Sequence, residues 1–315
     1  MNWSEASTPI PDQVRAACAW VAGRAHSVRV ERGAIEAYAA ALPAPAELAE
    51  PDPATQLLDG DREARAAFAI CLNAINFGSG WWPTIRKRPG HSGYFTIAAG
   101  LTERFRMGGP WTARELTRMS ATEVAAVVGQ DSGHLLMTQF ATVLRDVGEH
   151  LLAEHEGSFV AAVEATDGSA VALAGLLAEW QAFADLSAYD ERPVPFYKRA
   201  QLAAADIDRA GVASFPDRGR LTAFADNLVP HVLRLDGILR LTPALAEAID
   251  AGELLVHGSA EEVELRACAV HAVELLAAAT AGRLSPPDID AALWNRGGGP
   301  RYKAIPRPRS RSTAY

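Results

Sequence analysis

The sequence lacks the features that mark secreted, disulfide-stabilised and membrane-spanning proteins. Its 315 residues include three cysteines, Cys18, Cys71 and Cys268, which lie far apart and form no CxxC pair. The cysteines therefore predict neither a disulfide framework nor a zinc site. The first twenty residues contain Glu5 and Asp12 and do not resemble a signal peptide. No stretch approaches about 18 uninterrupted apolar residues, so we expect a cytoplasmic protein that does not enter a membrane.

Common cofactor and catalytic motifs are also missing. The chain has no GxGxxG that opens a helix, no P-loop, no GxSxG and no HExxH. Its eight histidines show no spacing typical of metal ligands. We therefore predict that neither a metal nor another cofactor takes part. The formal net charge of -8 argues against a protein that binds duplex nucleic acid in bulk, because such proteins are usually basic.

What the sequence contains instead is helical periodicity, while strand patterns are few. Apolar residues recur at spacings of three and four in residues 13–24, 33–41, 61–74, 113–118, 121–128, 135–154, 168–180, 217–239, 243–250, 260–280 and 286–294. Ser120 and Ser259 each precede such a segment and are followed by Glu at the third helical position, which is a capping-box pattern. Only residues 93–98 and 27–30 look like strands. We predict an all-α (mainly α) fold in a single domain, 1–315, that can divide into sub-lobes 1–185 and 186–315.

Three stretches interrupt the helical pattern. Residues 76–93 form a long loop rich in glycine, aromatic residues and cations, and residues 187–199 are rich in proline and aromatic residues. The tail, 297–315, is non-periodic and has five basic residues and no acidic one after Pro300. Long loops without secondary structure of their own are commonly either functional or disordered. These stretches are therefore candidate parts of a site.

The first two stretches carry candidate binding residues. In the first, Phe77 and Trp81 offer flat faces for stacking on a heterocycle, and nearby cations and His91 could hold a phosphate. The same residues would equally serve to anchor the loop to the core. In the second, Phe196 is followed by Lys198 and Arg199 at the start of a helix, where two cations favour a bound anion. An ordinary exposed Lys–Arg pair fits that spacing as well.

Ionisable residues also lie within the apolar segment 221–276. Pro230 is tolerated only in the first turn of a helix, which places Asp226 just before a helix N-terminus. A carboxylate kept ionised there suits stabilising an oxocarbenium-like cation or activating water. Asp236 follows ten residues later, about 15 Å along a straight helix. Both aspartates also fit structural roles, Asp226 as a cap and Asp236 as a partner of Arg234 or Arg240. Glu262 and Arg266, four residues apart, predict a structural ion pair.

Longer segments carry a family resemblance. The words LNAINFGSGWWP, PFYKRAQL, LTAFADNLVPHVLRLDGIL and GSAEEVELRACAVHAVELL, with a tail ending RSRSTAY, resemble the queuosine salvage protein family over nearly the whole chain and in the same order. The resemblance implies a helical fold similar to helix-hairpin-helix DNA glycosylases. It also implies metal-free hydrolysis of the ribose–base bond of queuosine 5′-phosphate, giving queuine and ribose 5-phosphate.

The resemblance also assigns roles to residues. It implies that Asp226 is the catalytic carboxylate and that Phe77 and Trp81 stack on the base. We infer in addition that Lys198, which matches the lysine of the family's YKRAQ motif, holds the phosphate. We also infer that Asp236 accepts hydrogen bonds from the guanine-like edge, because an ionised carboxylate accepts paired hydrogen bonds. The full set of candidate substrate-binding residues is Phe77, Trp81, His91, Phe196, Lys198, Arg199, His231, Arg234, Asp236 and Tyr315. The chain departs from the family pattern at His231, where an amide is usual, at Ala314, where an aromatic residue is usual, and in its glycine-rich residues 78–80.

Two other functions remain open from the residues alone. A glycosylase acting on a flipped DNA base, or on another nucleoside, would share the helical scaffold and the carboxylate. A non-catalytic helical module that binds a nucleotide would share the aromatic and basic loops. The acidic charge weighs against a duplex-binding enzyme, since gripping DNA requires a basic face. We expect a small-molecule substrate, with no duplex nucleic acid and no membrane as a partner.

Overall fold

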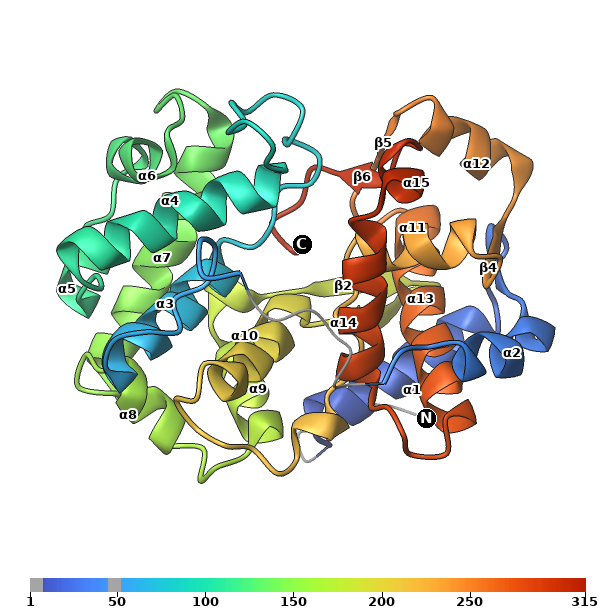
Figure 1. Ribbon diagram of the computed structural model, residues 1–315, viewed down its shortest axis with the longest axis horizontal. Helices are drawn as coiled ribbons and strands as arrows, with labels where there is room; N and C mark the ends of the chain where they lie inside the picture. Colours follow the sequence, from blue (N-terminus) through green and yellow to red (C-terminus); the bar gives the residue numbers. More distant parts are fainter. Residues whose placement is uncertain (1–7, 45–51) are drawn as a thin grey trace.

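A computed structural model describes residues 8–44 and 52–315 and contains two groups of helices that lie side by side (Figure 1). The group on the left of Figure 1 comprises α3 (Arg62–Ala74), α4 (Gly93–Gly108), α5 (Ala113–Leu116), α6 (Ala121–Val128), α7 (Leu135–Glu154), α8 (Phe159–Glu164), α9 (Ala170–Glu179) and α10 (Lys198–Arg209). The group on the right comprises α1 (Ile10–Ala22), α2 (Ile35–Ala40), α11 (Leu228–Leu235), α12 (Pro243–Asp250), α13 (Ala260–Ala279), α14 (Pro286–Gly297) and α15 (Pro300–Lys303). The prediction of a mainly α fold is confirmed.

The strands of the described chain form three two-stranded sheets. Two are antiparallel, β1 (Val28–Val30) with β4 (Leu239–Leu241) and β2 (Leu186–Tyr189) with β3 (Arg192–Pro195). The third is parallel and pairs β5 (Leu254–Leu255) with β6 (Arg309–Ser310). Single-turn 3₁₀ helices occur at η1 (Arg32–Ala34), η3 (Gln181–Phe183) and η4 (Arg218–Arg220). The strand predicted at residues 27–30 is thus confirmed as β1.

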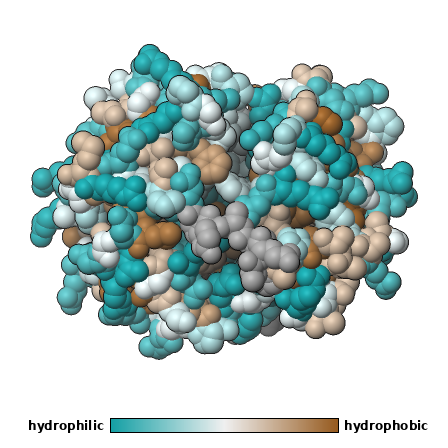
Figure 2. All heavy atoms as spheres, in the orientation of Figure 1, coloured by the Kyte–Doolittle hydropathy of each residue, from teal (hydrophilic) through white to brown (hydrophobic). Residues whose placement is uncertain are grey.

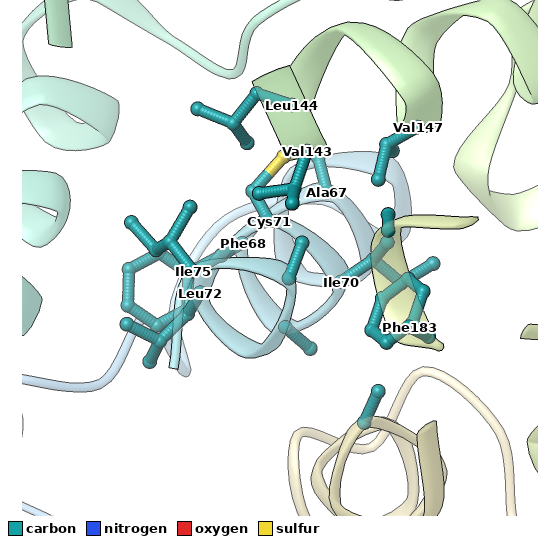
Figure 3. Packing of buried hydrophobic residues seen from close by; sticks show 14 of the residues in the cluster. Ala67, Phe68, Ile70, Cys71, Leu72, Ile75, Val143, Leu144, Val147 and Phe183 are labelled. Carbon is teal, nitrogen blue, oxygen red and sulfur yellow. The ribbon is translucent and has the colours of Figure 1, made fainter. Parts of the chain in front are cut away.

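Helix α3 is the centre of the first helix group. Asp61 caps its N-terminus by accepting a hydrogen bond from the Ala64 N–H, and every residue from Ala66 to Ala74 is buried. Figure 3 shows α3 side chains packing against α7 and against Phe183 of η3. A helix that is apolar on all sides belongs inside a core rather than on a surface, so α3 supplies the rigid support for the loop that follows it.

Helix α13 is the centre of the second helix group. It packs against α1, α2, α11 and α14 and is buried over most of its length. The two groups also meet through aromatic rings, where Trp294 of α14 lies edge-on to Tyr94 and Phe95 of α4 at 6.1 and 5.5 Å. The single-domain interpretation, with sub-lobes 1–185 and 186–315, stays a prediction.

The strand predicted at residues 93–98 is wrong, because these residues begin α4. Ser92 caps the helix by accepting a hydrogen bond from the Phe95 N–H, and the helix continues to Gly108. Its apolar side chains Ile97, Leu101 and Phe105 recur at helical spacing and are buried. The aromatic and β-branched residues at its start resemble a strand only in a short window.

The single helix predicted over residues 217–239 is also wrong. The structure has η4, then a non-helical segment over residues 221–227, and then the short helix α11. The Thr222 N–H donates to the side chain of Gln201, and the Phe224 N–H donates to the carboxyl group of Asp290, both at 2.9 Å. Side chains of other helices therefore take the place of helical hydrogen bonds in this segment.

The surface shows no continuous apolar band on the face drawn in Figure 2, where hydrophilic and hydrophobic residues alternate. Large exposed apolar side chains such as Met107 and Val256 are scattered, as is usual for a protein surface. Within the described ranges, every helix falls short of the length or the apolar content that crossing a bilayer requires.

Candidate active site

The tail of the chain lies between the two helix groups, where residues 76–80 hold it (Figure 1). The Gly78 N–H donates to the Tyr315 carbonyl and the Gly80 N–H donates to the Ser310 carbonyl, each at 3.1 Å. A Cβ atom at Gly80 would lie 2.6 Å from the Ser310 carbonyl oxygen, and Gly78 has a φ of +111°. Both positions therefore require glycine, and the glycine-rich loop serves to seat the tail.

Arg199 joins the tail to the first helix group from within the core. Its guanidinium donates to the carbonyl of Ala74, at the end of α3, and to the carbonyl of Ala314. The rings of Phe77 and Phe183 flank it at 5.1 and 5.7 Å. Burial lowers the pKa of Arg199 to about 10. The side chain is only 1% exposed, so these contacts give Arg199 a structural role, and the predicted phosphate contact stays a prediction.

Lys198, the preceding residue, begins α10 and lies among carboxyl groups. Its backbone N–H donates to the carboxylate of Asp185 at 3.0 Å, and its ammonium donates to the Asn76 carbonyl at 3.1 Å. Burial lowers the pKa of Lys198 to about 8, while the negative charges of Asp226, Asp290 and Asp185 act in the opposite direction. The amine of Lys198 is therefore charged at neutral pH and loses its proton at slightly higher pH, and it lies close to Asp226.

Asp226 lies where the sequence predicted, immediately before the N-terminus of α11. Its Oδ1 accepts hydrogen bonds from the N–H groups of Leu228 at 2.8 Å and Val229 at 3.0 Å. Its Oδ2 has no hydrogen-bond or ion-pair partner among residues 8–44 and 52–315. The carboxyl group is thus fixed through one oxygen, and the other is free to contact a substrate or a water molecule.

Asp226 borders a small cleft whose wall is a buried charged cluster. Glu262 and Arg266 of α13 and Tyr315 of the tail also line the cleft. The Arg266 guanidinium lies between two rings, 3.9 Å from the centre of Phe196 and 4.4 Å from that of Tyr315. The predicted pair of Glu262 and Arg266 is confirmed at 3.8 Å. Although burial opposes the charge, neighbouring carboxylates hold the pKa of Arg266 above its usual value.

Two buried aspartates of the site were not predicted as functional. Asp185 accepts a hydrogen bond from Arg266 at 2.7 Å as well as one from the Lys198 N–H. Asp290, on α14, accepts from the Phe224 N–H, and burial together with the charge of Asp226 raises its pKa well above the usual value. Asp290 had a usable signal, since it falls next to Ile289 on the apolar face of a predicted helix. Asp185 lies in a non-periodic segment and had none.

The sequence of the chain matches a known protein family. The family model described as "Queuosine salvage protein" matches residues 57–315, which include Lys198, Asp226, Asp290 and Tyr315. The chain belongs to the queuosine salvage family. A relative from Sphaerobacter thermophilus, named queuosine 5′-phosphate N-glycosylase/hydrolase, is 35% identical over 266 residues, which cover 81% of this chain and 82% of the relative.

Two further members of the queuosine salvage family carry the same name. The protein of Dictyostelium discoideum is 28% identical over 263 residues, covering 80% of this chain and 79% of its own. The protein of Bos taurus is 32% identical over 194 residues, covering 59% of this chain and 57% of its own. The similarity therefore extends to relatives in both bacteria and eukaryotes.

In this family member the aromatic candidates lie largely inside the protein. Phe77 is 1% exposed and contacts Phe140 edge-on at 5.0 Å, and Trp81 is 6% exposed. Phe196 supports the Arg266 guanidinium from within the core. These contacts favour the anchoring alternative, and base stacking stays a prediction. His91 lies in the loop, where its Nδ1 is 3.0 Å from the Pro89 carbonyl oxygen.

His231 and Arg234, two candidates on α11, contact other protein groups. His231 is fully buried and its Nε2 lies 2.9 Å from the Tyr302 carbonyl oxygen. Arg234 forms an ion pair with Asp250 at 2.8 Å. Their roles in substrate binding stay predictions, and the contacts seen here favour structural roles.

Asp236 lies at the opposite end of α11 from Asp226. It accepts hydrogen bonds from the hydroxyl groups of Tyr38 at 2.6 Å and Tyr302 at 2.7 Å, and its carboxylate is 2.9 Å from Arg296. The predicted pairing with Arg234 or Arg240 is wrong, because Arg296 and Arg301 are its cations. Both carboxylate oxygens are engaged, which favours a structural role over reading the base.

Proposed function

We propose that this protein hydrolyses the N-glycosidic bond of queuosine 5′-phosphate and releases queuine and ribose 5-phosphate. The observation that carries the proposal is the arrangement of Asp226, which is fixed by two backbone N–H groups and presents a free Oδ2. The names of the relatives supply the substrate. The reaction needs only a carboxylate, a cation and water, so the proposal includes no cofactor.

The chemistry of the base explains why a carboxylate is the central group. A 7-deazaguanine has no N7, so the usual protonation that helps a purine leave is not available. The enzyme must therefore stabilise the positive charge that develops on the ribose and position the water that attacks it. A free carboxylate oxygen at Asp226 does both, because it attracts the oxocarbenium-like carbon and accepts a proton from water.

Lys198 is the proposed phosphate contact. A buried ammonium is costly unless an anion accompanies it, and the charge of Asp226 is the largest interaction that favours the charged form of Lys198. Arg307 is also partly buried, which lowers its pKa, while the charge of Asp226 acts in the opposite direction. A phosphate bound by such cations would use remote binding energy to position the sugar.

The finer parts of the proposal follow from family membership and composition. They are a resemblance to helix-hairpin-helix DNA glycosylases, a cytoplasmic location, and a free nucleotide rather than duplex nucleic acid as the substrate. The formal net charge of -8 supports the last of these, because a duplex-binding enzyme requires a basic contact face.

The test compares substrates on the purified protein. Queuosine, its 5′-phosphate, its 3′-phosphate and a duplex oligonucleotide are incubated separately, and released queuine or other base is measured by mass spectrometry. We expect queuine from the 5′-phosphate. Base release from the duplex alone would indicate a DNA glycosylase, and binding of the nucleotide without release would indicate a non-catalytic module.

The Asp226→Asn variant tests the residue assignment. Its amide oxygen can still accept the N–H groups of Leu228 and Val229, so the start of α11 should be kept. Loss of a general base typically slows a reaction about 10²–10⁴-fold, and we expect a loss of that size with an unchanged melting temperature. Equal rates for the variant and the parent would rule out Asp226 as the catalytic carboxylate.

A further inference from the structure

Asp290 is a second buried carboxyl group beside Asp226, and the proposed attack of water assigns it no role. Helix α14 carries it to the segment that precedes α11, where its Oδ1 accepts the Phe224 N–H at 2.9 Å. Phe224 is two residues before Asp226, so the α-carbons of these two residues lie within about 7 Å of each other. Asp290 therefore reaches the backbone that positions the catalytic carboxylate.

The two carboxyl groups are held in the same way. In each, Oδ1 accepts backbone N–H groups, and Oδ2 has no hydrogen-bond or ion-pair partner in the described part of the chain. Asp290 is the more deeply buried, at 6% exposure. The Oδ2 of Asp290 remains accessible to solvent, unlike the unpartnered buried oxygens of Asp185 and Glu262. An accessible carboxyl oxygen beside Asp226 is available to contact a substrate.

The charges around Asp290 distinguish it from Asp226. Burial and then the charge of Asp226 raise its pKa, while the Phe224 N–H and the cations Lys198 and Arg209 of α10 act against the rise. The net direction favours the protonated acid, which can donate a proton. Neighbouring carboxyl groups in different environments commonly divide into an acid and a base in this way.

We propose that Asp290 is the general acid that protonates the leaving nitrogen of the base while Asp226 serves the attacking water. This inference rests on the proposed function. The bond between C1′ of the ribose and the base nitrogen breaks with its electron pair going to the nitrogen, which takes the proton of Asp290. The oxygen of water bonds to C1′ and its proton goes to Asp226. Transfer of that proton from Asp226 to Asp290 restores the starting state, so one water is consumed and no other reactant is needed.

Substrates whose bases differ in acidity can distinguish a general acid at Asp290 from a residue with a structural role only. Parent, Asp290→Asn and Asp226→Asn are compared on the 5′-phosphates of unsubstituted, 7-aminomethyl- and 7-cyano-7-deazaguanosine. The base becomes a progressively better leaving group in this order, because the protonated aminomethyl group and then the cyano group withdraw electrons from the ring. We expect Asp290→Asn to lose about 10²–10⁴-fold on the poorest leaving group and at least several-fold less on the 7-cyano compound. Asp226→Asn should lose similar factors on all three.

The controls distinguish a variant that does not fold from a folded variant that has lost the general acid. The amide of Asp290→Asn can still accept the Phe224 N–H, and thermal unfolding checks the fold. Asp288→Asn is the matched control, because Asp288 lies on the same helix but contacts Ser285 and Arg218, and it should retain the parent rate on every substrate. Equal losses of Asp290→Asn across the series would overturn the inference. If the parent cleaves none of these compounds and not queuosine 5′-phosphate either, the proposed function itself fails.

A second measurement decides the case in which the parent cleaves only queuosine 5′-phosphate. The Asp290→Ala variant leaves space for a small acid, and formate is added at increasing concentration. We expect at least a tenfold recovery of rate with Asp290→Ala and none with Asp288→Ala. No recovery in formate, with the fold intact, would assign Asp290 to holding the Phe224 segment alone.

Discussion

Arg266 and Asp185 form an ion pair at 2.7 Å in which the two side chains are 1% and 0% exposed. Removing one member of a buried pair leaves an uncompensated charge and typically costs about 3–5 kcal/mol. We therefore predict that Arg266→Met lowers the free energy of unfolding by that amount in urea titrations. Arg106→Met is the control, since Arg106 and Asp59 form an exposed pair and its loss should cost at most about 1 kcal/mol. Similar losses for both variants would contradict the prediction.

The lowered pKa of Lys198 leads us to predict a loss of substrate affinity at alkaline pH. Its pKa is lowered to about 8, so the ammonium loses its charge as the pH rises through that value. If it holds the phosphate, the KM for queuosine 5′-phosphate should rise above pH 8 while kcat changes less. The same measurement on queuosine, which has no phosphate, serves as the control. A parallel rise of KM for both substrates would remove Lys198 from the phosphate site.

Loss of the charge of Lys198 at alkaline pH has the opposite effect on the stability of the fold. The folded pKa of about 8 lies below the ordinary value of 10.5, so the unfolded chain binds more protons between these values. Stability from this group should therefore increase as the pH rises from about 8 to 10.5. Unfolding in urea at pH 8 and pH 10 should show a smaller gain for Lys198→Met than for the parent, and an equal gain would contradict the assignment.

His231 predicts a loss of stability in acid. Burial lowers its pKa below the ordinary 6.5, although the hydrogen bond to the Tyr302 carbonyl acts against this. The unfolded chain then binds more protons below pH 6.5, and the folded state loses stability there. His231→Gln keeps a donor for the carbonyl without a titrating group. We expect the variant to lose less stability than the parent between pH 7 and pH 5, with the other buried histidines common to both.

We predict that a substitution at Asp236 lowers stability but leaves the catalytic activity almost unchanged. Its carboxylate holds Tyr38, Tyr302 and Arg296, and loss of buried hydrogen-bond partners costs about 1–3 kcal/mol. Asp236→Leu should lower the free energy of unfolding by about that much, with kcat and KM for queuosine 5′-phosphate almost unchanged below the melting temperature. A large rise in KM with unchanged stability would instead support contact with the base.

Local signals account for what the sequence could predict. Ser120 and Ser259 cap their helices as expected, and Pro230 placed Asp226 correctly before α11, because caps and proline act within one turn. The non-helical segment around Phe224 could not be predicted, since its hydrogen bonds come from distant Gln201 and Asp290. Contacts between distant segments also decide the partners of Asp236, which no spacing in the sequence reveals.

The docking of the tail on Gly78 and Gly80 has a consequence for how activity can be lost. The site is assembled from residues 76–80, α10, α14 and the tail, so no fragment shorter than residues 76–315 contains all four. Cleavage near Arg309 would therefore remove Tyr315 from the Arg266 guanidinium while the two helix groups keep their packing. A protease could silence such a molecule without unfolding it, so circular dichroism would not distinguish the nicked protein from the intact one, whereas catalytic turnover would.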